Sequence, residues 1–245
     1  MRTLLLSDLH ANLEALDAVL DAAGSWDRLL VLGDLVGYGP DPNLVVERIR
    51  ALGPQMVIRG NHDKVASGLE SSQDFNETAR RAAEWTQRTL SAANRTYLAE
   101  LPEGPSVIEP QLLICHGTPF DEDAYIVEQL DALQVLQQFT HPVCFFGHTH
   151  VQIGYWRSEA EFDVLMPSES NGAVVLEPQA KHYLLNPGSV GQPRDGDPRA
   201  AYAVYDDRGP VFQFGRAAYA IDVVQEKIRS AGLPDSLARR LALGR

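Results

Sequence analysis

Histidine, aspartate and asparagine gather where short apolar segments of the chain end. The segment that finishes in "FFGHTH" (residues 145–150) carries two histidines on either side of one threonine, and four other apolar segments end in groups of similar type. The candidate residues at these ends are Asp8, His10, Asp34, Asn61, His62, Asp63, His116, His148 and His150. The remaining histidines, His141 and His182, do not follow this pattern, and we interpret them as surface or loop residues.

These residue types predict a site for divalent cations. Imidazole nitrogen, carboxylate oxygen and amide oxygen are ligands of Mn²⁺, Fe²⁺ and Zn²⁺, with no thiolate required. The set offers more groups than one tetrahedral ion needs, which indicates two cations. In "DLH" and "HTH" a spacing of two residues places both side chains on one side of an extended segment, so both reach the same pocket. The carboxylate of Asp34 has two oxygens and can bridge a pair of ions.

A structural interpretation of each single motif is also open. One histidine at a strand end is usually structural, and "GNHD" is equally typical of an ordinary turn, because Gly, Asn and Asp favour turns. Five separate segments that all end in such groups are hard to obtain by chance. We therefore expect a shared site.

The apolar segments alternate with helical patterns over the first two thirds of the chain. Helices are predicted over 13–23, over 42–52 with Asp41 as the cap and Pro42 first, in segments through about 97, and near 131–139. Such alternation indicates a largely parallel sheet, in which side chains at the carboxyl ends of the strands converge.

After His150 the pattern changes to shorter β-like segments. They begin with "IGYW" and end with "VFQFG", and they predict a second, mostly antiparallel sheet packed against the first. Two helices close the chain, over 221–231 and 234–243. Because no Ser/Gly-rich linker or repeat interrupts the sequence, we expect a single domain over 1–245 with a lid-like helical insert at about 72–101.

Composition restricts the classes of function. The 245 residues are 44% hydrophobic and 22% charged, as in soluble globular proteins. The net charge of −12 argues against broad binding of nucleic acid or anionic membranes. We interpret "MRTLLLSDLH" as a first strand rather than a signal peptide and expect a cytoplasmic protein that can form homo-oligomers. Cys115 and Cys144 lie in apolar segments, which predicts buried free thiols.

The motifs "DLH", "GDLVGYG", "GNHD", "CHGTP" and "GHTH", in this order, resemble the calcineurin-like metallophosphoesterase family. The later segment "NPGSVGQPR" is similar to the small bacterial and archaeal phosphodiesterase branch of that family. The resemblance implies a two-sheet β-sandwich flanked by helices, a four-layer α/β architecture that some schemes class as α+β. This agrees with the strands expected from the sequence.

The resemblance also divides the candidate ligands between two ions, with Asp34 bridging them. The ligands of the first are Asp8, His10 and His150. Those of the second are Asn61, His116 and His148. The cofactors would be two divalent metal ions per chain, drawn from Mn²⁺, Fe²⁺ (or Fe³⁺) and Zn²⁺, and Thr149 would point away from them into the structure.

The implied reaction is hydrolysis of a phosphodiester or phosphomonoester by attack of a hydroxide that bridges the metals. His62 matches the catalytic histidine of the family and would protonate the leaving oxygen or stabilise its developing charge. Asp63 would orient His62, although it can also serve as a turn former.

Three further residues are candidates for substrate binding, each with a structural alternative. Asn12 would contact substrate or cap the first helix, and capping is the safer interpretation. Tyr38 would stack on a base or sugar, or cover its own loop. Arg194 would hold a phosphate or remain a solvated loop residue, and its Gly/Pro-rich segment (188–198) is expected to fold back towards the metals.

We expect a small phosphate ester as the substrate. Hydrolysis of diadenosine polyphosphates is the alternative activity, and a non-catalytic metal-binding scaffold for protein interactions is a further one. A nuclease is disfavoured by the acidic charge and by the lack of an added DNA-binding domain.

Overall fold

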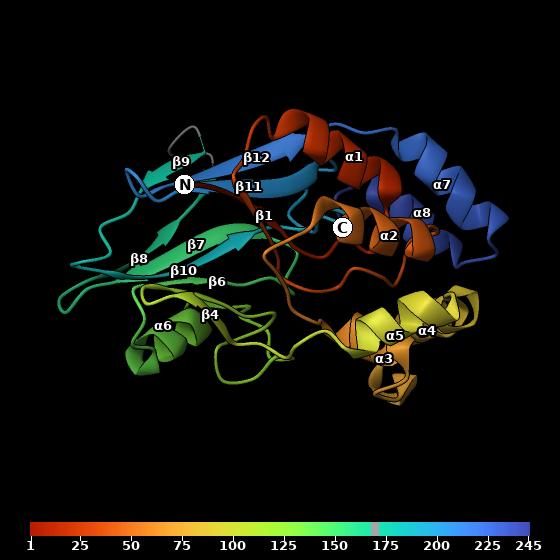
Figure 1. The fold of residues 1–245 in the computed structure, drawn as a ribbon, viewed down its shortest axis with the longest axis horizontal. Coiled ribbons are helices and arrows are strands. Elements are labelled where there is room, and N and C mark those ends of the chain that lie inside the picture. Colours follow the sequence, from red (N-terminus) through yellow and green to blue (C-terminus); the bar gives the residue numbers. More distant parts are fainter. Residues whose placement is uncertain (168–171) are drawn as a thin grey trace.

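A computed structural model describes residues 1–167 and 172–245 and contains two six-stranded sheets (Figure 1). In order, the first sheet contains β3 (Met56–Val57), β2 (Arg28–Val31), β1 (Arg2–Leu6), β11 (Ala200–Asp206), β12 (Val211–Ala217) and β9 (Ala173–Val175). The second contains β4 (Ser106–Glu109), β5 (Leu112–Ile114), β6 (Val143–Phe145), β10 (His182–Pro187), β7 (Gln152–Arg157) and β8 (Phe162–Leu165). The predicted two-sheet fold flanked by helices is confirmed.

The predicted division of strands between the sheets was wrong. We expected one parallel sheet from the first part of the chain and one antiparallel sheet from the rest. Instead, β1 pairs in parallel with β2 and antiparallel with β11, while β10 pairs in parallel with β6 and antiparallel with β7. Each sheet is therefore mixed, because strands from the last part of the chain extend both of the parallel groups.

Helices flank the two sheets (Figure 1). They are α1 (Leu13–Ala22), α2 (Pro42–Leu52), α3 (Asn61–Ser67), α4 (Glu77–Thr89), α5 (Ala92–Ala99), α6 (Gln129–Gln138), α7 (Ile221–Ser230) and α8 (Asp235–Leu241). A short 3₁₀ helix, η1 (Ser72–Asp74), precedes α4, so the stretch 72–101 is mainly helical; that it is a lid-like insert in a single domain stays a prediction. Within the described parts of the chain, no helix is both long and apolar enough to span a membrane.

The first strand shows how one apolar run supports two layers. Leu4 and Leu6 pack in a core with α1 and α2, whereas Leu5 packs in the core between the two sheets with Leu30 and Phe145. A strand covered on both faces reads as a continuous apolar segment instead of an alternating one. Because both faces of such a strand are covered, polar groups that meet a ligand lie at the ends of the strand.

The two cysteines follow the sequence expectation. Cys115 and Cys144 are free and buried, and their Sγ atoms lie 3.4 Å apart on neighbouring segments of the second sheet. They pack with α6 residues in the core on the outer side of that sheet. The prediction of buried free thiols is confirmed.

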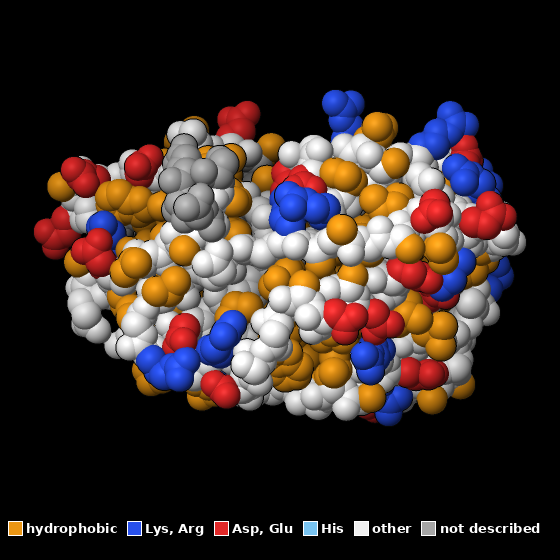
Figure 2. Space-filling view, turned by 90° about the horizontal axis from the view of Figure 1, so that it is seen from above, with side chains coloured by type: hydrophobic (Ala, Val, Ile, Leu, Met, Phe, Trp, Pro, Cys, Tyr) orange, Lys and Arg blue, Asp and Glu red, His pale blue; other side chains and the backbone are white. Residues whose placement is uncertain are grey.

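The surface carries charges of both signs. Figure 2 shows lysine and arginine side chains interspersed with aspartate and glutamate on the face seen from above. Several exposed arginines are paired with acids of their own segment, among them Arg80 with Glu77 and Arg239 with Asp235. With 33 acidic and 21 basic residues in the chain, the net charge is −12, and the absence of nucleic-acid partners stays a prediction.

Asn12 caps helix α1. Its Oδ1 accepts a hydrogen bond from the Ala15 backbone N–H at 3.1 Å, and its Nδ2 donates to the Gly191 carbonyl at 2.9 Å. The side chain is buried, and both ends of its amide are used within the protein. The structure thus shows the capping interpretation, while the predicted substrate contact of Asn12 stays a prediction.

We predict that Asn12→Ala lowers the free energy of unfolding by about 2 kcal/mol, because it removes a cap and leaves the buried Gly191 carbonyl without its donor. Asn76→Ala, which removes only the exposed cap of α4, should cost about 1 kcal/mol. Urea denaturation of the metal-free protein in EDTA measures both. Equal losses in the two variants would contradict a second structural role for Asn12.

Candidate metal centre

The candidate ligands converge where the parallel strands of both sheets end. Asp8 and His10 follow β1, and Asp34 follows β2 in the first sheet. His116 follows β5, while His148 and His150 follow β6 in the second sheet. Six side chains form two overlapping groups, each with ligand atoms within 4.8 Å of one another. The first group is Asp8, His10, Asp34 and His150, and the second is Asp34, His116 and His148.

In the first group the ligand atoms nearly touch. His150 Nε2 lies 3.2 Å from Asp8 Oδ1 and 3.0 Å from His10 Nε2. His10 Nε2 is in turn 3.7 Å from Asp34 Oδ2 and 3.8 Å from Asp8 Oδ1. Asp34 also belongs to the second group, where its Oδ2 lies 3.5 Å from His116 Nε2. One carboxylate therefore faces both groups, as a bridging ligand must.

Each of the four imidazoles is fixed by a backbone carbonyl. Nδ1 of His10 contacts the Val36 carbonyl at 3.0 Å. The other three contacts are from His116 Nδ1 to Leu32 O at 2.7 Å, from His150 Nδ1 to Gln192 O at 2.6 Å, and from His148 Nε2 to Asp123 O at 3.1 Å. A carbonyl only accepts, so these ring nitrogens carry the hydrogen, and the opposite nitrogen keeps a lone pair for a metal.

With these tautomers, the unprotonated ring nitrogens of the candidate ligands face one another, and this shows whether the site suits a metal ion. Because Nδ1 of both His10 and His150 donates, two Nε2 lone pairs face each other across 3.0 Å, which is favourable only with a cation or proton between them. Asp8 Oδ1, Asn61 Oδ1 and His116 Nε2 are buried and have no hydrogen-bond partner in the described structure. Unpartnered buried acceptors are costly, so this donor set fits divalent cations.

The backbone at the ligands is strained. Asp8, His10, Asp34, His148 and His150 all have positive φ, between 46° and 65°. Residues with a Cβ rarely adopt this region, and such strain concentrates at functional sites. The sharp turns bring side chains two residues apart, such as those of Asp8 and His10, into one group.

Two glycines make room for the site. A Cβ at Gly60 would overlap the Asp34 carboxylate, and one at Gly37, whose φ is +90°, would overlap the His62 imidazole. Gly37 in "GDLVGYG" and Gly60 in "GNHD" are thus required, because the loops that carry them approach these two side chains closely.

Burial has the largest influence on the pKa values of most of the histidines in the site. It lowers the pKa of His62 to about 4 and that of His148 to about 3, and it also lowers the pKa of His10 and His150. All four imidazoles are therefore neutral at pH 7, the form that binds metals.

His116 behaves differently because it faces Asp34. Burial alone would lower the pKa of His116, but attraction to the Asp34 carboxylate outweighs it and raises the pKa to about 10. Burial would raise the pKa of both Asp8 and Asp34, yet His150 and His116, respectively, hold these pKa values below the usual range. Without a cation, the site keeps two carboxylates ionised by retaining a proton on His116.

His62 lies beside the two groups without belonging to either. Its backbone N–H donates to Asp34 Oδ1 at 2.9 Å, and its ring lies 4.3 Å from that of Tyr38, 4.6 Å from that of Phe75 and 5.0 Å from that of His10, centroid to centroid. This places the predicted catalytic residue next to the candidate ligands with its ring free of them.

The contact predicted between Asp63 and His62 is absent from the described structure. Asp63 Oδ2 accepts from the Gly60 N–H at 3.0 Å, Oδ1 accepts from the Val36 N–H at 3.2 Å, and His62 Nδ1 has no hydrogen-bond partner there. Burial, with repulsion from Asp34, raises the pKa of Asp63 to about 8. The carboxyl group joins the start of α3 to the loop after β2, which is the role of a turn former.

Tyr38, Arg194 and the segment 188–198 approach the site as expected. The guanidinium carbon of Arg194 lies 5.8 Å from the centre of the Tyr38 ring, and the Arg194 N–H donates to the His150 carbonyl at 3.0 Å. Gly191 N–H donates to the Asp8 carbonyl at 2.9 Å. The Gly/Pro-rich segment therefore folds back against two candidate ligands, which puts Arg194 beside the centre.

A cavity of about 370 Å³ opens next to the candidate ligands. Its lining includes Asn61, His62, His148 and Tyr38, together with residues that sequence reasoning missed. These are Glu70, Ser71, Asp74, Phe75, Asn76, Ala79, Asp123 and Tyr125. Tyr125 stacks on His148 with ring centroids 3.7 Å apart. No motif marks these residues, because they lie in loops, in η1 or near the start of α4, and none of them follows the end of a strand.

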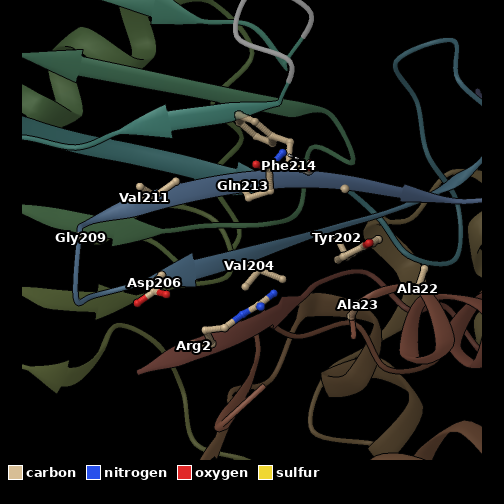
Figure 3. Close-up of a pocket in the computed structure, with 11 residues that line it drawn as sticks. Arg2, Ala22, Ala23, Tyr202, Val204, Asp206, Gly209, Val211, Gln213 and Phe214 are labelled. Atoms are coloured by element: carbon tan, nitrogen blue, oxygen red, sulfur yellow. Dashed lines mark hydrogen bonds between the residues drawn. The ribbon is translucent and has the colours of Figure 1, made fainter. Parts of the chain in front are cut away.

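A second cavity, of about 530 Å³, is unrelated to this centre. Figure 3 shows Arg2, Tyr202, Val204 and Phe214 around it, on strands β1, β11 and β12 of the first sheet. Its described lining includes none of the candidate ligands or of the predicted substrate-binding residues, so we assign it no part in the site.

The residues set aside in the sequence lie apart from the two ligand groups. His182 Nδ1 contacts the carbonyl of His141 at 2.9 Å, and neither side chain belongs to the groups described above. Thr149 Oγ1 accepts from Asn186 Nδ2 at 3.0 Å, so it points into the structure as predicted.

Comparison with known proteins identifies the family of this chain. Residues 1–208 match the model of the calcineurin-like phosphoesterase superfamily domain. An uncharacterized protein of Methanocaldococcus jannaschii is 37% identical over 248 residues, covering 98% of this chain and 97% of the relative. The phosphodiesterase YfcE of Escherichia coli is 25% identical over 218 residues, covering 84% and 88%.

Solved structures agree with the sequence relatives. The crystal structure of a metallophosphoesterase from Sphaerobacter thermophilus is 40% identical, covers both chains fully and superposes with a TM-score of 0.85. A protein from Pyrococcus horikoshii shares the fold, with a TM-score of 0.81 at 18% identity over 100% of this chain and 98% of the other. With the match of the family model over most of its length, this chain belongs to the calcineurin-like phosphoesterase superfamily.

Proposed function

We propose that this protein hydrolyses a phosphodiester or a phosphomonoester with two divalent cations bound between the strand ends. The observation that carries the proposal is the pair of ligand groups that share Asp34, with every imidazole oriented by a backbone carbonyl. Asp8, His10 and His150 would hold one cation, and Asn61, His116 and His148 the other. The name of the relative YfcE, a phosphodiesterase, supports a diester as the substrate.

Bound cations would activate a water molecule as the nucleophile and offset negative charge on the phosphate oxygens. The chain supplies a nitrogen and oxygen donor set with no thiolate in either group, which suits Mn²⁺, Fe²⁺ and Zn²⁺. Both cysteines belong to a separate core, so they take no part in binding.

His62 would act on the leaving group as a hydrogen-bond donor. Because burial lowers its pKa to about 4, the imidazole is neutral at pH 7 and carries one N–H instead of a spare proton. A neutral donor stabilises negative charge that develops on the leaving oxygen, which favours the second of the two roles expected from the sequence. The rings of Tyr38 and Phe75 hold the imidazole in place.

Arg194 would bind a phosphate oxygen that faces away from the cations. It lies at the edge of the centre, against the ring of Tyr38, and is partly exposed. Its Nη2 donates to Gln192 Oε1 at 3.3 Å, and its other N–H groups would meet the substrate. A diadenosine polyphosphatase or a non-catalytic scaffold has no observation in its favour here. A solved structure of a putative diadenosine tetraphosphatase is only 16% identical and shows the fold alone.

Metal content tests the two-cation proposal. Wild-type protein loaded with Mn²⁺ and desalted should contain about two ions per chain by mass spectrometry of the metal. Asp34→Asn should lose most of both, because Asp34 faces both ligand groups, whereas Asp17→Asn on the exposed face of α1 should lose none. His10→Ala and His148→Ala should each retain about one ion. An unchanged content in Asp34→Asn would exclude a bridging carboxylate.

The role of His62 is tested by kinetics. His62→Ala should lower kcat for bis(4-nitrophenyl) phosphate about 100-fold while the metal content stays the same, because the ring contacts the leaving group and not the cations. His141→Ala, a histidine distant from the two ligand groups, serves as the control. If His62→Ala kept full activity, or lost a metal ion, the assignment would be wrong.

Cation binding should also release a proton. The metal-free site holds a proton on His116 at pH 7, since the pKa of this group is raised to about 10, and only the deprotonated ring can bind a metal. The affinity for Mn²⁺ should therefore rise about tenfold per pH unit between pH 6 and pH 8, as expected for one proton released. Calorimetric titrations in buffers of different ionisation enthalpy count the protons. His116→Gln should flatten this slope, and a wild-type affinity independent of pH would contradict the assignment.

A further inference from the structure

The cavity beside the metal centre is walled by aromatic rings. Tyr38, Phe75 and Tyr125 all line it. Tyr38 and Phe75 pack at a tilt against His62, and Tyr125 stacks on His148. His62, 4% exposed, forms part of the same wall with its Nδ1 unpartnered in the described structure. The cavity thus adjoins the position where a leaving group would sit.

The cavity is also acidic. Glu70, Asp74 and Asp123 line it, and its described lining contains no lysine or arginine. Lys64 lies behind this wall, 2% exposed, with its Nζ 3.0 Å from Glu70 Oε1, 3.0 Å from Glu122 Oε1 and 2.6 Å from Asp123 Oδ2. Arg59 also pairs with Glu122, its Nη2 lying 2.9 Å from Glu122 Oε1, so two basic groups face three carboxylates and this part of the wall keeps a net negative charge.

Asp74 adds a charge that this network does not neutralise. It lies at the end of η1, next to Phe75, and it forms no ion pair with the described residues. The basic group of the site, Arg194, does not line the cavity and instead lies against Tyr38. The centre therefore has a basic side suited to phosphate and an acidic, aromatic side that a second phosphate would avoid.

We propose that this cavity binds an alkylammonium group on the leaving alcohol of the substrate. Aromatic faces attract an ammonium ion through the ring quadrupole, and carboxylates next to the rings add to this attraction. This inference rests on the proposed phosphodiesterase function and names its substrate class: a phosphodiester in which one alcohol carries a quaternary or primary amine. It places polyphosphate dinucleotides, with their additional negative charges, outside that class.

Two matched diesters test the proposal. Methyl phosphocholine and methyl 3,3-dimethylbutyl phosphate differ only in a nitrogen that replaces a carbon, so their shapes agree and their charges do not. In both, water adds its oxygen to phosphorus, the P–O bond to the larger alcohol breaks, and one proton of the water ends on that alcohol. Both reactions yield methyl phosphate, which ³¹P NMR quantifies.

The Mn²⁺-loaded wild-type protein should cleave the choline ester with a kcat/KM about tenfold higher than that of the neutral ester. Asp74→Asn and Phe75→Leu should each reduce this ratio at least threefold. Glu77→Gln, which removes the same charge from the nearby start of α4 without lining the cavity, should leave the ratio unchanged.

A ratio near one in the wild-type protein would overturn the proposal, as would a ratio that survives in both cavity variants. Bis(4-nitrophenyl) phosphate separates this failure from failure of the proposed function. Its turnover without any preference for the choline ester refutes only the ammonium subsite. No turnover of any of the three esters refutes the phosphodiesterase function, and the subsite with it.

Discussion

The candidate metal centre depends on the close approach of several electron-pair donors. The Nε2 atoms of His10 and His150 lie 3.0 Å apart, and carboxylate oxygens of Asp8 and Asp34 lie within 4 Å of one or both. In the metal-free protein the proton on His116 offsets part of the repulsion between these groups, and the rest acts in a site that is almost inaccessible to water. The fold must therefore hold the groups together by other means until a cation binds.

Those means are the buried strands and the hydrogen bonds of the loops. The apolar residues Leu4, Leu5 and Leu6 fix β1 between two cores, which in turn fixes where Asp8 and His10 emerge. Backbone carbonyls then set the rotation of each imidazole. The positive φ of five ligands shows that packing around the loops stabilises a backbone that the residues alone would not adopt.

The parts of this arrangement that depend on local sequence pattern could be predicted from the sequence. Buried strands read as apolar runs, and the polar groups at their ends identified all six side chains of the two ligand groups. The pairing of β11 with β1 and of β10 with β6 was not predictable in the same way. An apolar run shows that a strand is covered on both faces and carries no information on which neighbour lies at each edge. The partner of Asp63 was missed for a related reason, since backbone N–H groups have no sequence signature.

The two groups of candidate ligands differ in how their imidazoles are held in place. His10, His116 and His150 are oriented by carbonyls at the ends of strands or in the loop packed against Asp8. His148 is oriented by the Asp123 carbonyl, in a surface loop that Lys64 ties to α3 through the Asp123 side chain. Tyr125 of that loop stacks on His148, and Asp123 and Tyr125 both line the cavity. A molecule bound in the cavity would therefore contact the loop that orients His148. In the proposed function, substrate binding and the second cation would share this loop as a support, whereas the first cation would be held by residues fixed by the core of the fold.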